Sequence, residues 1–404
     1  MTTPISDAGP APKWALGKIV TATVAVQVTI VMASLTIPVL ASLIFASAGI
    51  PPYLVGYYSS TVYGCAAATS LATPRLLRHS GAIRLHQIML LMTVAALLVL
   101  LPAIPAGFGV SALILGLAYG PMNPASTVLM ARYTPPALRS RIFSLKQTAV
   151  PAGGALAGAL APILAAATGW RGTLLVIAVM CVVLALLIEP WRGQLDRNPP
   201  PQPGRLDTRF WLPARVLLRY PGLRAVGAAS FAFGAIQFSF SAVFTTVLAS
   251  IGWSLKSAGI ILATALAVGV VCRIPWGGVA DRVGSRPILG LLGLMMSVAA
   301  FTGAFLSAAW PGIAVVGLAT LFGLSAYCWA GIGLAETVRQ APPGMISEAS
   351  AGTIALTFLG ALAGPALFST ATALTGSFRP AFILLGMICL WPSVALLRRQ
   401  PVTG

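Results

Sequence analysis

Two stretches of this chain, about 200 residues apart, share one pattern of apolar runs and turn residues. The segments 56–81 and 259–284 are each a long apolar run that ends in a short loop with arginine, and their closing glycines, Gly81 and Gly284, are 203 positions apart. A second set of matches has a shift of 207. It pairs Gly116, Arg132, Pro135, Pro136, Ser140, Gly153, Thr168 and Gly169 with Gly323, Arg339, Pro342, Pro343, Ser347, Gly360, Thr375 and Gly376. Because both copies have the same spacing, we predict two related halves in tandem.

The composition places these halves in a membrane. Hydrophobic residues make up 58% of the 404 residues, charged residues make up 8%, and the mean hydropathy is +0.92. A soluble chain needs about 25% charged residues to cover its surface. Since a helix needs about 20 apolar residues to cross the hydrocarbon core, the chain has room for roughly twelve spans. We therefore predict an all-α membrane protein.

The twelve predicted transmembrane helices form two six-helix pseudo-repeat bundles joined by a hydrophilic linker. The first bundle occupies 1–189, the linker 190–221 and the second bundle 222–404. The spans lie near 18–46, 53–73, 85–103, 108–131, 143–168, 172–189, 222–250, 257–279, 287–308, 312–337, 347–375 and 380–397. The first apolar run is too long for a signal peptide, so we interpret it as an uncleaved span.

The distribution of positive charge predicts the orientation of the spans. With both termini in the cytoplasm, 22 of the 25 Lys and Arg residues lie on the cytoplasmic side, and Arg171, Lys256 and Arg379 lie outside. This bias is what insertion into a bacterial inner membrane produces. We therefore expect a multi-pass inner-membrane protein with cytoplasmic termini. The net charge of +18 is spread over these short loops, which argues against a nucleic-acid-binding patch.

The linker between the halves has its own signature. It contains seven prolines from Pro190 to Pro221, and a proline run favours extended chain over helix. Its later part, 205–220, is basic and amphipathic, which predicts a helix lying at the cytoplasmic surface of the membrane. The apolar residues of this part are Phe210, Trp211, Leu212, Val216 and Leu217.

The loop "GGVADRVGSRP" from Gly277 to Pro287 resembles the cytoplasmic signature G-x-x-x-D-R-x-G-R/K of the major facilitator superfamily (MFS). The resemblance covers the whole chain, because twelve spans, doubled halves and a middle linker are also typical of that family. It implies a secondary transporter in which this loop latches the cytoplasmic ends of the halves in the outward-open state. It also implies that Asp281 then faces the start of the fifth span, near Arg139, Arg141 and Lys146. The residues that match the signature are Gly277, Asp281, Arg282, Gly284 and Arg286.

The first-half copy and the fifth span differ from two family patterns. In "PRLLRHSGAIR", Pro74 and Arg78 replace the first Gly and the Asp of the signature, so a symmetrical latch is not expected. The fifth span is rich in Gly and Pro, as in drug/proton antiporters of the family, and this supports an exporter of hydrophobic compounds as the alternative function. However, Ala112 occupies the position four residues before Gly116 where those antiporters often carry Arg.

Ionisable residues inside the spans are few, which makes each a functional candidate. Lys146 and Arg273 lie deeper than the loop cations, where they can hold an anionic substrate, snorkel to the surface or, for Arg273, pair with Asp281 or Glu336. Glu336 is a possible proton-coupling carboxylate or a structural partner of Arg339. The two histidines, His79 and His86, are interpreted as interfacial.

The family resemblance implies a cavity lined by the first, fourth, seventh and tenth spans. Buried amides in apolar helices need partners, so each candidate has a helix contact as its alternative role. Pro121 and Pro124 bracket Asn123 and free carbonyls there. The polar and aromatic candidates are Gln27, Ser34, Tyr119, Asn123, Ser126, Gln237, Ser239, Tyr327 and Trp329.

Other function classes lack the residues they require. A membrane enzyme needs a nucleophile with a base or a metal cluster, and an ATP-driven pump needs a P-loop; the sequence has neither. A receptor would normally add a soluble domain. The expected function is secondary transport of a small anionic or neutral organic solute by a monomer without cofactor or metal. Its expected partners are that solute, the lipid bilayer and, if Glu336 couples, a co-transported proton.

Overall fold

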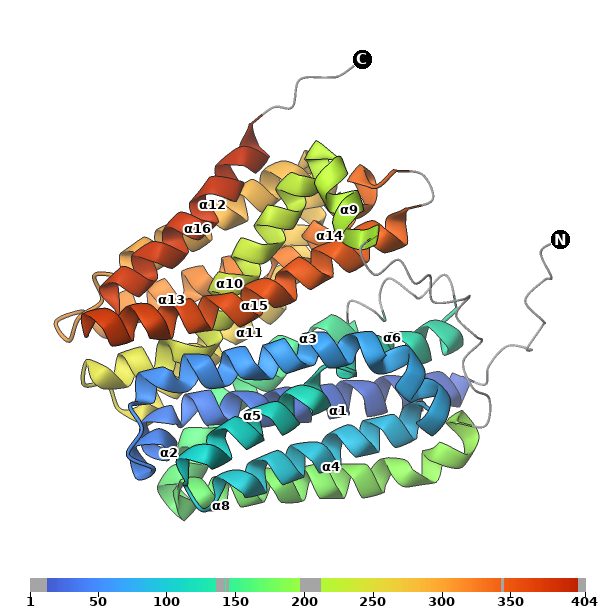
Figure 1. Cartoon of the computed structure of the whole chain (residues 1–404), viewed down its shortest axis with the longest axis horizontal. Coiled ribbons are helices and arrows are strands. Elements are labelled where there is room, and N and C mark those ends of the chain that lie inside the picture. Colours follow the sequence, from blue (N-terminus) through green and yellow to red (C-terminus); the bar gives the residue numbers. More distant parts are fainter. Residues whose placement is uncertain (1–12, 136–141, 143–144, 197–211, 343–344, 399–404) are drawn as a thin grey trace.

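The computed structural model describes residues 13–135, 142, 145–196, 212–342 and 345–398, and every regular element among them is a helix. The helices before the linker lie together in the lower part of Figure 1, and those after it lie above them. The first group comprises α1 (Lys13–Val39), α2 (Ala41–Ser47), η1 (Pro52–Leu54), α3 (Val55–Ser80), α4 (Ala82–Leu100), α5 (Pro105–Tyr119), α6 (Met122–Tyr133) and α8 (Ala149–Leu195). The second comprises α9 (Leu212–Arg219), α10 (Pro221–Ser250), α11 (Leu255–Val283), α12 (Ser285–Gly303), α13 (Gly312–Ala326), α14 (Trp329–Gln340), α15 (Ile346–Thr375) and α16 (Arg379–Leu397).

Ten helical segments of the described chain are long and apolar enough to cross a membrane. One of them, Leu145–Gly193, has 49 residues, and its backbone turns back at Gly169, which has φ 71° and ψ 169°. A residue with a side chain rarely adopts this conformation, so glycine permits the turn. The 26-residue helix α3 is not among the ten segments, although it packs between α5 and α15.

Element boundaries recur at the offsets found in the sequence. Helices α5 and α6 begin and end 207 positions before α13 and α14, and α4 begins and ends 203 positions before α12. The turn glycines also correspond: Gly81 and Gly284 have φ 80° and 103°, while Gly169 and Gly376 have φ 71° and 66°. Helix boundaries and turn glycines therefore recur at matching positions in both groups.

Three predicted spans are interrupted, and only the interruption of the fourth was indicated by its prolines. The first, 18–46, is divided at Leu40 into α1 and α2, just after Pro38. The fourth, 108–131, is divided into α5 and α6 at Gly120 and Pro121, and the tenth, 312–337, into α13 and α14. Pro124 has no N–H to donate to the carbonyl of Gly120, which explains the fourth-span break. The structure gives no comparable cause for the tenth.

The linker boundaries also differ from the prediction. Helix α8 does not stop at residue 189 but continues through Pro190 to Leu195. The amphipathic segment folds as α9, whose Val216 and Leu217 pack on Leu223 of α10 and Ala349 of α15. Phe210 and Trp211 lie outside the described residues. In the described part of the chain this helix spans Leu212–Arg219, and its apolar face is docked on the second group.

The two groups meet closely at one end of the molecule. We call the end with α9 and the α3–α4 and α11–α12 turns the linker end, and the opposite end, with α2, the far end (left in Figure 1). At the far end the Ser369 hydroxyl donates to the Tyr53 carbonyl at 2.6 Å, and the Tyr57 and Thr370 hydroxyls lie 2.6 Å apart. These bonds join α15 to η1 and α3, so the far end is closed.

Small residues allow this closure. Gly158 of α8 and Gly259 of α11 lie backbone against backbone: a Cβ added to Gly158 would be 2.6 Å from the Gly259 carbonyl oxygen. Gly56 of α3 makes a similar approach to Pro365 of α15. Helices in lipid associate through such contacts because no hydrophobic driving force draws them together.

We predict that Gly158→Val opens the far end, because the added methyl groups force α8 away from α11. The closed state can be measured by crosslinking Cys residues placed at Tyr57 and Thr370 in a Cys-free background. The yield should fall several-fold in Gly158→Val. Gly317→Val is the matched control, since a Cβ at Gly317 meets no atom within 4 Å. Equal yields in both variants would contradict this role of the glycine contact.

Candidate functional site

A buried cation lies inside the first group, where three helices meet. Lys146 is 2% exposed, and its Nζ donates to the Asn123 carbonyl at 3.0 Å and to the Thr127 hydroxyl at 2.7 Å. The Asn123 side chain in turn accepts a hydrogen bond from Gln27 Nε2 at 3.2 Å. We call Gln27, Asn123, Thr127 and Lys146 the lysine cluster. Lys146 therefore points inward to α6 and does not snorkel to the surface, which was one alternative for it.

A second cation bridges the two groups. Arg273 of α11 donates through Nη1 to the Gln147 carbonyl at 2.7 Å, and through Nε and Nη2 to the Tyr327 carbonyl at 3.2 and 2.8 Å. Pro151 cannot donate to the Gln147 carbonyl four residues earlier, so that oxygen is left for Arg273. The Tyr327 carbonyl lies at the break between α13 and α14. The alternative pairing of Arg273 with Asp281 or Glu336 is therefore wrong for this structure.

These two cations are close in the fold, because Arg273 binds the carbonyl of the residue that follows Lys146. Within the described chain, neither forms an ion pair, and the oxygens that they contact belong to carbonyl and hydroxyl groups. A charge removed from water without a counter-ion raises the local potential. The junction between α8 and α11 is therefore positive and suited to an anion.

Amide and aromatic side chains from the second group lie beside this junction. Gln237 of α10 accepts a hydrogen bond from Trp329 Nε1 at 2.9 Å, and the Tyr327 hydroxyl is hydrogen-bonded to Ser241. These contacts connect α10 to the α13–α14 break. They satisfy the indole and phenol groups, which need partners when they are buried.

An aromatic contact between α3 and α10 also joins the two groups. The Tyr63 ring of α3 lies 4.4 Å from the Phe238 ring of α10 and 5.7 Å from the Tyr119 ring of α5, centroid to centroid. Both tyrosines are buried. Tyr119 was an expected candidate. It is the last residue of α5, and it precedes Asn123 of the lysine cluster by four residues.

The serine candidates have a local role in this structure. Ser34 donates to the Ile30 carbonyl at 2.9 Å, Ser126 to Met122 at 2.8 Å and Ser239 to Ala235 at 2.7 Å, each four residues back in its own helix. Such bonds satisfy the hydroxyl without any other helix. Ser239 also faces a small apolar cavity with several Phe side chains within the second group.

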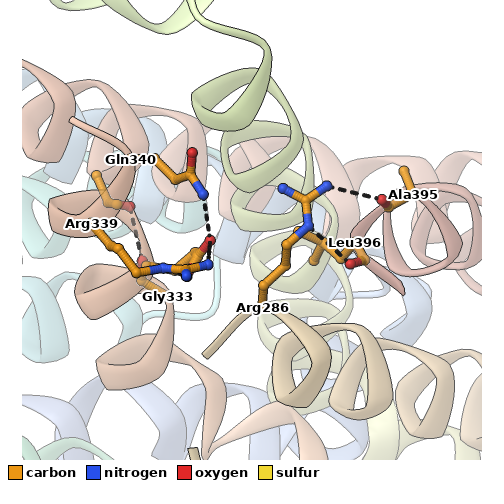
Figure 2. Close-up of polar contacts among 8 residues, drawn as sticks. Arg286, Gly333, Arg339, Gln340, Ala395 and Leu396 are labelled. Carbon is orange, nitrogen blue, oxygen red and sulfur yellow. Dashed lines mark hydrogen bonds and ion pairs between the residues drawn. The ribbon is translucent and has the colours of Figure 1, made fainter. Parts of the chain in front are cut away.

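Glu336 is a fully buried acid whose oxygens are both bound. Arg339 donates to them at 2.9 and 2.8 Å, and Gln340 donates at 2.9 Å. Figure 2 shows Arg339 and Gln340 directed at the same carboxylate near the linker end. This geometry is the structural pairing that its spacing from Arg339 suggested, and it leaves the carboxylate with three donors.

The signature loop adopts a helix–turn–helix form at the linker end. Gly284 takes φ 103° between α11 and α12, and Asp281 and Arg282 are exposed. Arg286 donates to the carbonyls of Leu396 and Ala395 at 3.0 and 3.2 Å, so it caps the C-terminal end of α16 within its own group (Figure 2). A Cβ added at Gly277 would meet no other atom within 4 Å, so no close contact requires glycine there.

The expected latch is not formed in this conformation. Asp281 makes no hydrogen bond or ion pair within the described chain, and Lys146 is held by the lysine cluster instead. Arg139 and Arg141, its other expected neighbours, lie outside the described residues. The two groups are thus hydrogen-bonded at the far end. Asp281 of the signature loop, at the linker end, has no hydrogen bond or ion pair to the first group within the described chain.

Several site residues were missed by sequence reasoning. Thr127 lies one turn after Asn123, and Gln147 precedes Pro151 by four residues; that spacing could have identified its free carbonyl. His86, expected at the interface, is 1% exposed inside the first group, with Nδ1 2.6 Å from the Ala82 carbonyl. His79 is exposed as expected.

Comparison with known proteins agrees with this architecture. A family model described as "Major Facilitator Superfamily" matches residues 22–365. The hexuronate transporter of Bacillus subtilis (strain 168) is 24% identical over 324 residues, which cover 75% of this chain and 76% of that protein.

Solved structures share the fold at low sequence identity. The nucleoside transporter NupG has a TM-score of 0.74 at 14% identity, covering 95% of this chain and 99% of that one. A bacterial homologue of the human lysosomal transporter Spinster, in an inward-facing and unoccupied conformation, has a TM-score of 0.72 at 14% identity, covering 96% and 95%. Together with the family match over most of its length, this shows that the chain belongs to the Major Facilitator Superfamily of small-solute transporters.

Proposed function

We propose that this protein moves a small organic anion across the bacterial inner membrane by alternating access. The observation that carries the proposal is the pair of cations at the α8–α11 junction, buried Lys146 and half-buried Arg273, neither of which has a carboxylate partner in the described chain. They come from different groups, so a bound anion would contact both halves of the transporter. The hexuronate transporter among its relatives, named for an anionic solute, supports the same substrate charge.

The proposed architecture has twelve spans in two six-helix bundles, 1–189 and 222–404. The turn at Gly169 divides one 49-residue segment into two crossings, and α3 adds another to the ten candidates. The recurring element boundaries support two parallel repeats that are related by an axis along the membrane normal, with the substrate site between them. Parallel repeats of this kind rock against each other around a central site.

Charge supports a cytoplasmic linker end. With that orientation, the closed far end is periplasmic, and the free Asp281 loop corresponds to an inward-facing conformation. Asp281 would then join the other half only when the cytoplasmic side closes. The signature loop is proposed as the gate, composed of Gly277, Asp281, Arg282, Gly284 and Arg286.

The alternative, a proton-coupled exporter of hydrophobic compounds, is less well supported. A cationic drug requires a buried carboxylate free to pair with it, and Glu336 is already bound by Arg339 and Gln340. Glu348, which has one buried oxygen without a partner, lies in the first turn of α15, where the helix dipole favours a carboxylate.

Topology can be tested at two exposed charged positions at opposite ends. We predict that Arg219→Cys on α9 reacts with a membrane-impermeant maleimide only after permeabilisation, because it is cytoplasmic. Lys256→Cys on α11 should react in intact cells. Both substitutions are made in a Cys-free background. Labelling of Arg219→Cys in intact cells would show that the linker end is periplasmic and contradict the proposed orientation.

The gate predicts a kinetic defect for Asp281→Asn. Removing the charge weakens the outward-open latch, and a loss of about 1.4 kcal/mol shifts a two-state population about tenfold. We therefore expect transport to fall by about that factor at unchanged membrane insertion. Glu189→Gln, an exposed acid at the same end, is the control. Normal rates for Asp281→Asn would show that the loop serves topology alone.

Substrate charge predicts the effect of neutralising the two cations. A hydrogen bond to a charged group contributes about 1.5–3 kcal/mol. Lys146→Gln and Arg273→Gln should therefore each lower kcat/KM for a transported carboxylate by about tenfold to a hundredfold. Arg215→Gln, at an exposed position of α9, should leave kcat/KM unchanged. Proteoliposome uptake of carboxylates and of lipophilic cations provides the measurement. Robust uptake of cations, unaffected by either substitution, would refute an anion site.

A further inference from the structure

The lysine cluster contains one buried polar atom without a partner. Gln27 is 0% exposed, and although its Nε2 donates to Asn123, its Oε1 is buried and accepts no hydrogen bond. A buried amide oxygen left unpaired costs free energy, so a donor that reached this oxygen would be favoured. The unpaired oxygen lies in the same cluster as the Lys146 ammonium.

The same cluster retains unused donors. An ammonium group has three N–H donors, and Lys146 uses two, on the Asn123 carbonyl and the Thr127 hydroxyl. The Asn123 amide nitrogen makes no hydrogen bond within the described chain, and its side chain is half-buried, as is that of Thr127. Gln27 and Lys146 are thus the buried members of the cluster, and the α6 residues Asn123 and Thr127 are its partly exposed members.

We propose that the lysine cluster recognises a carboxylate that carries a hydroxyl group close to it. The inference rests on the proposed anion transport and adds the substrate class. The carboxylate takes the remaining N–H of Lys146 and the Asn123 amide, while the neighbouring hydroxyl pairs with Gln27.

A hydroxyl is the group that fits Gln27 in either orientation of its amide. In the orientation described, the free atom is an oxygen and needs a donor. If the Gln27 and Asn123 amides are both turned over, the free atom of Gln27 becomes an N–H donor and needs an acceptor, and the carboxylate is then bound by Lys146 without the Asn123 amide. A hydroxyl both donates and accepts, whereas a methylene does neither. A deoxy analogue would therefore leave the amide unpaired, which is the condition under which a site rejects a ligand strongly.

The second group has no copy of this cluster. At the repeat offsets, Ser230, Ala330 and Thr353 stand where the first group has Gln27, Asn123 and Lys146. No cation or amide occurs among these three. Recognition of the hydroxyl is thus assigned to the first half, and Arg273 contributes positive charge from the second.

The test measures binding to the full-length protein in lipid nanodiscs by isothermal titration calorimetry, with empty nanodiscs subtracted. The probes are two pairs with equal carbon numbers: gluconate with hexanoate, and lactate with propionate. We expect at least one hydroxy acid to bind about tenfold or more tightly than its deoxy partner. Gln27→Met, which keeps the length but removes the amide, should reduce this ratio to nearly one by weakening the hydroxy acid.

Leu145→Met is the control, because Leu145 directly precedes Lys146 and its side chain is exposed. It should keep the wild-type ratio. Equal binding of both members of each pair to the wild-type protein would overturn the inference while leaving anion transport intact, and this result needs no variant to fold. A ratio that survives in Gln27→Met would also overturn it. If no carboxylate binds and Lys146→Gln has no effect on transport, the proposed function itself fails.

Discussion

Backbone carbonyls at helix interruptions are the groups on which the polar interior of this protein depends. In the hydrocarbon core, every backbone polar group must find a partner within the protein. Pro151 leaves the Gln147 carbonyl without its helical N–H, and Arg273 occupies that oxygen together with the Tyr327 carbonyl at the α13–α14 break. The Asn123 carbonyl, in the first turn of α6, also accepts a hydrogen bond from Lys146. Backbone carbonyls thus hold both cations without any acid.

This arrangement connects packing to motion. Glycine contacts such as Gly158 with Gly259 bring α8 and α11 together at the far end, and Arg273 links the same two helices toward the linker end. The glycine contact is apolar and tolerates sliding, whereas the arginine bonds depend on the position of one carbonyl oxygen. A change in the angle between the groups therefore changes the arginine bonds first. An anion bound at that junction can compensate for them, which is how a substrate would influence the balance between conformations.

The sequence predicted the class of fold well because apolar length and glycine spacing determine it. The turns at Gly81, Gly169, Gly284 and Gly376 lie where the repeat placed them. The interruption at Tyr327 was missed because no proline marks it. The depth of Lys146 was recognised, but its partners were not, since Thr127 and the Asn123 carbonyl come from a different helix, α6. Partners of this kind depend on how helices pack, and one sequence does not contain that information in its local pattern.

The two groups share recurring helix boundaries but not the same charged residues, and the proposed selective site depends on this difference. Two identical halves would present equal charges across the junction, and a small substrate would meet the same chemistry on both sides. Here the ammonium of Lys146 and the amide of Gln27 come from the first half, and the guanidinium of Arg273 comes from the second. Removing an ion such as Lys146 from water costs several kcal/mol, even with carbonyl partners. Such a cost is sustained only if the bound state returns it, and an anion in contact with both halves returns it most fully, because each cation gains a counter-charge in a medium of low dielectric.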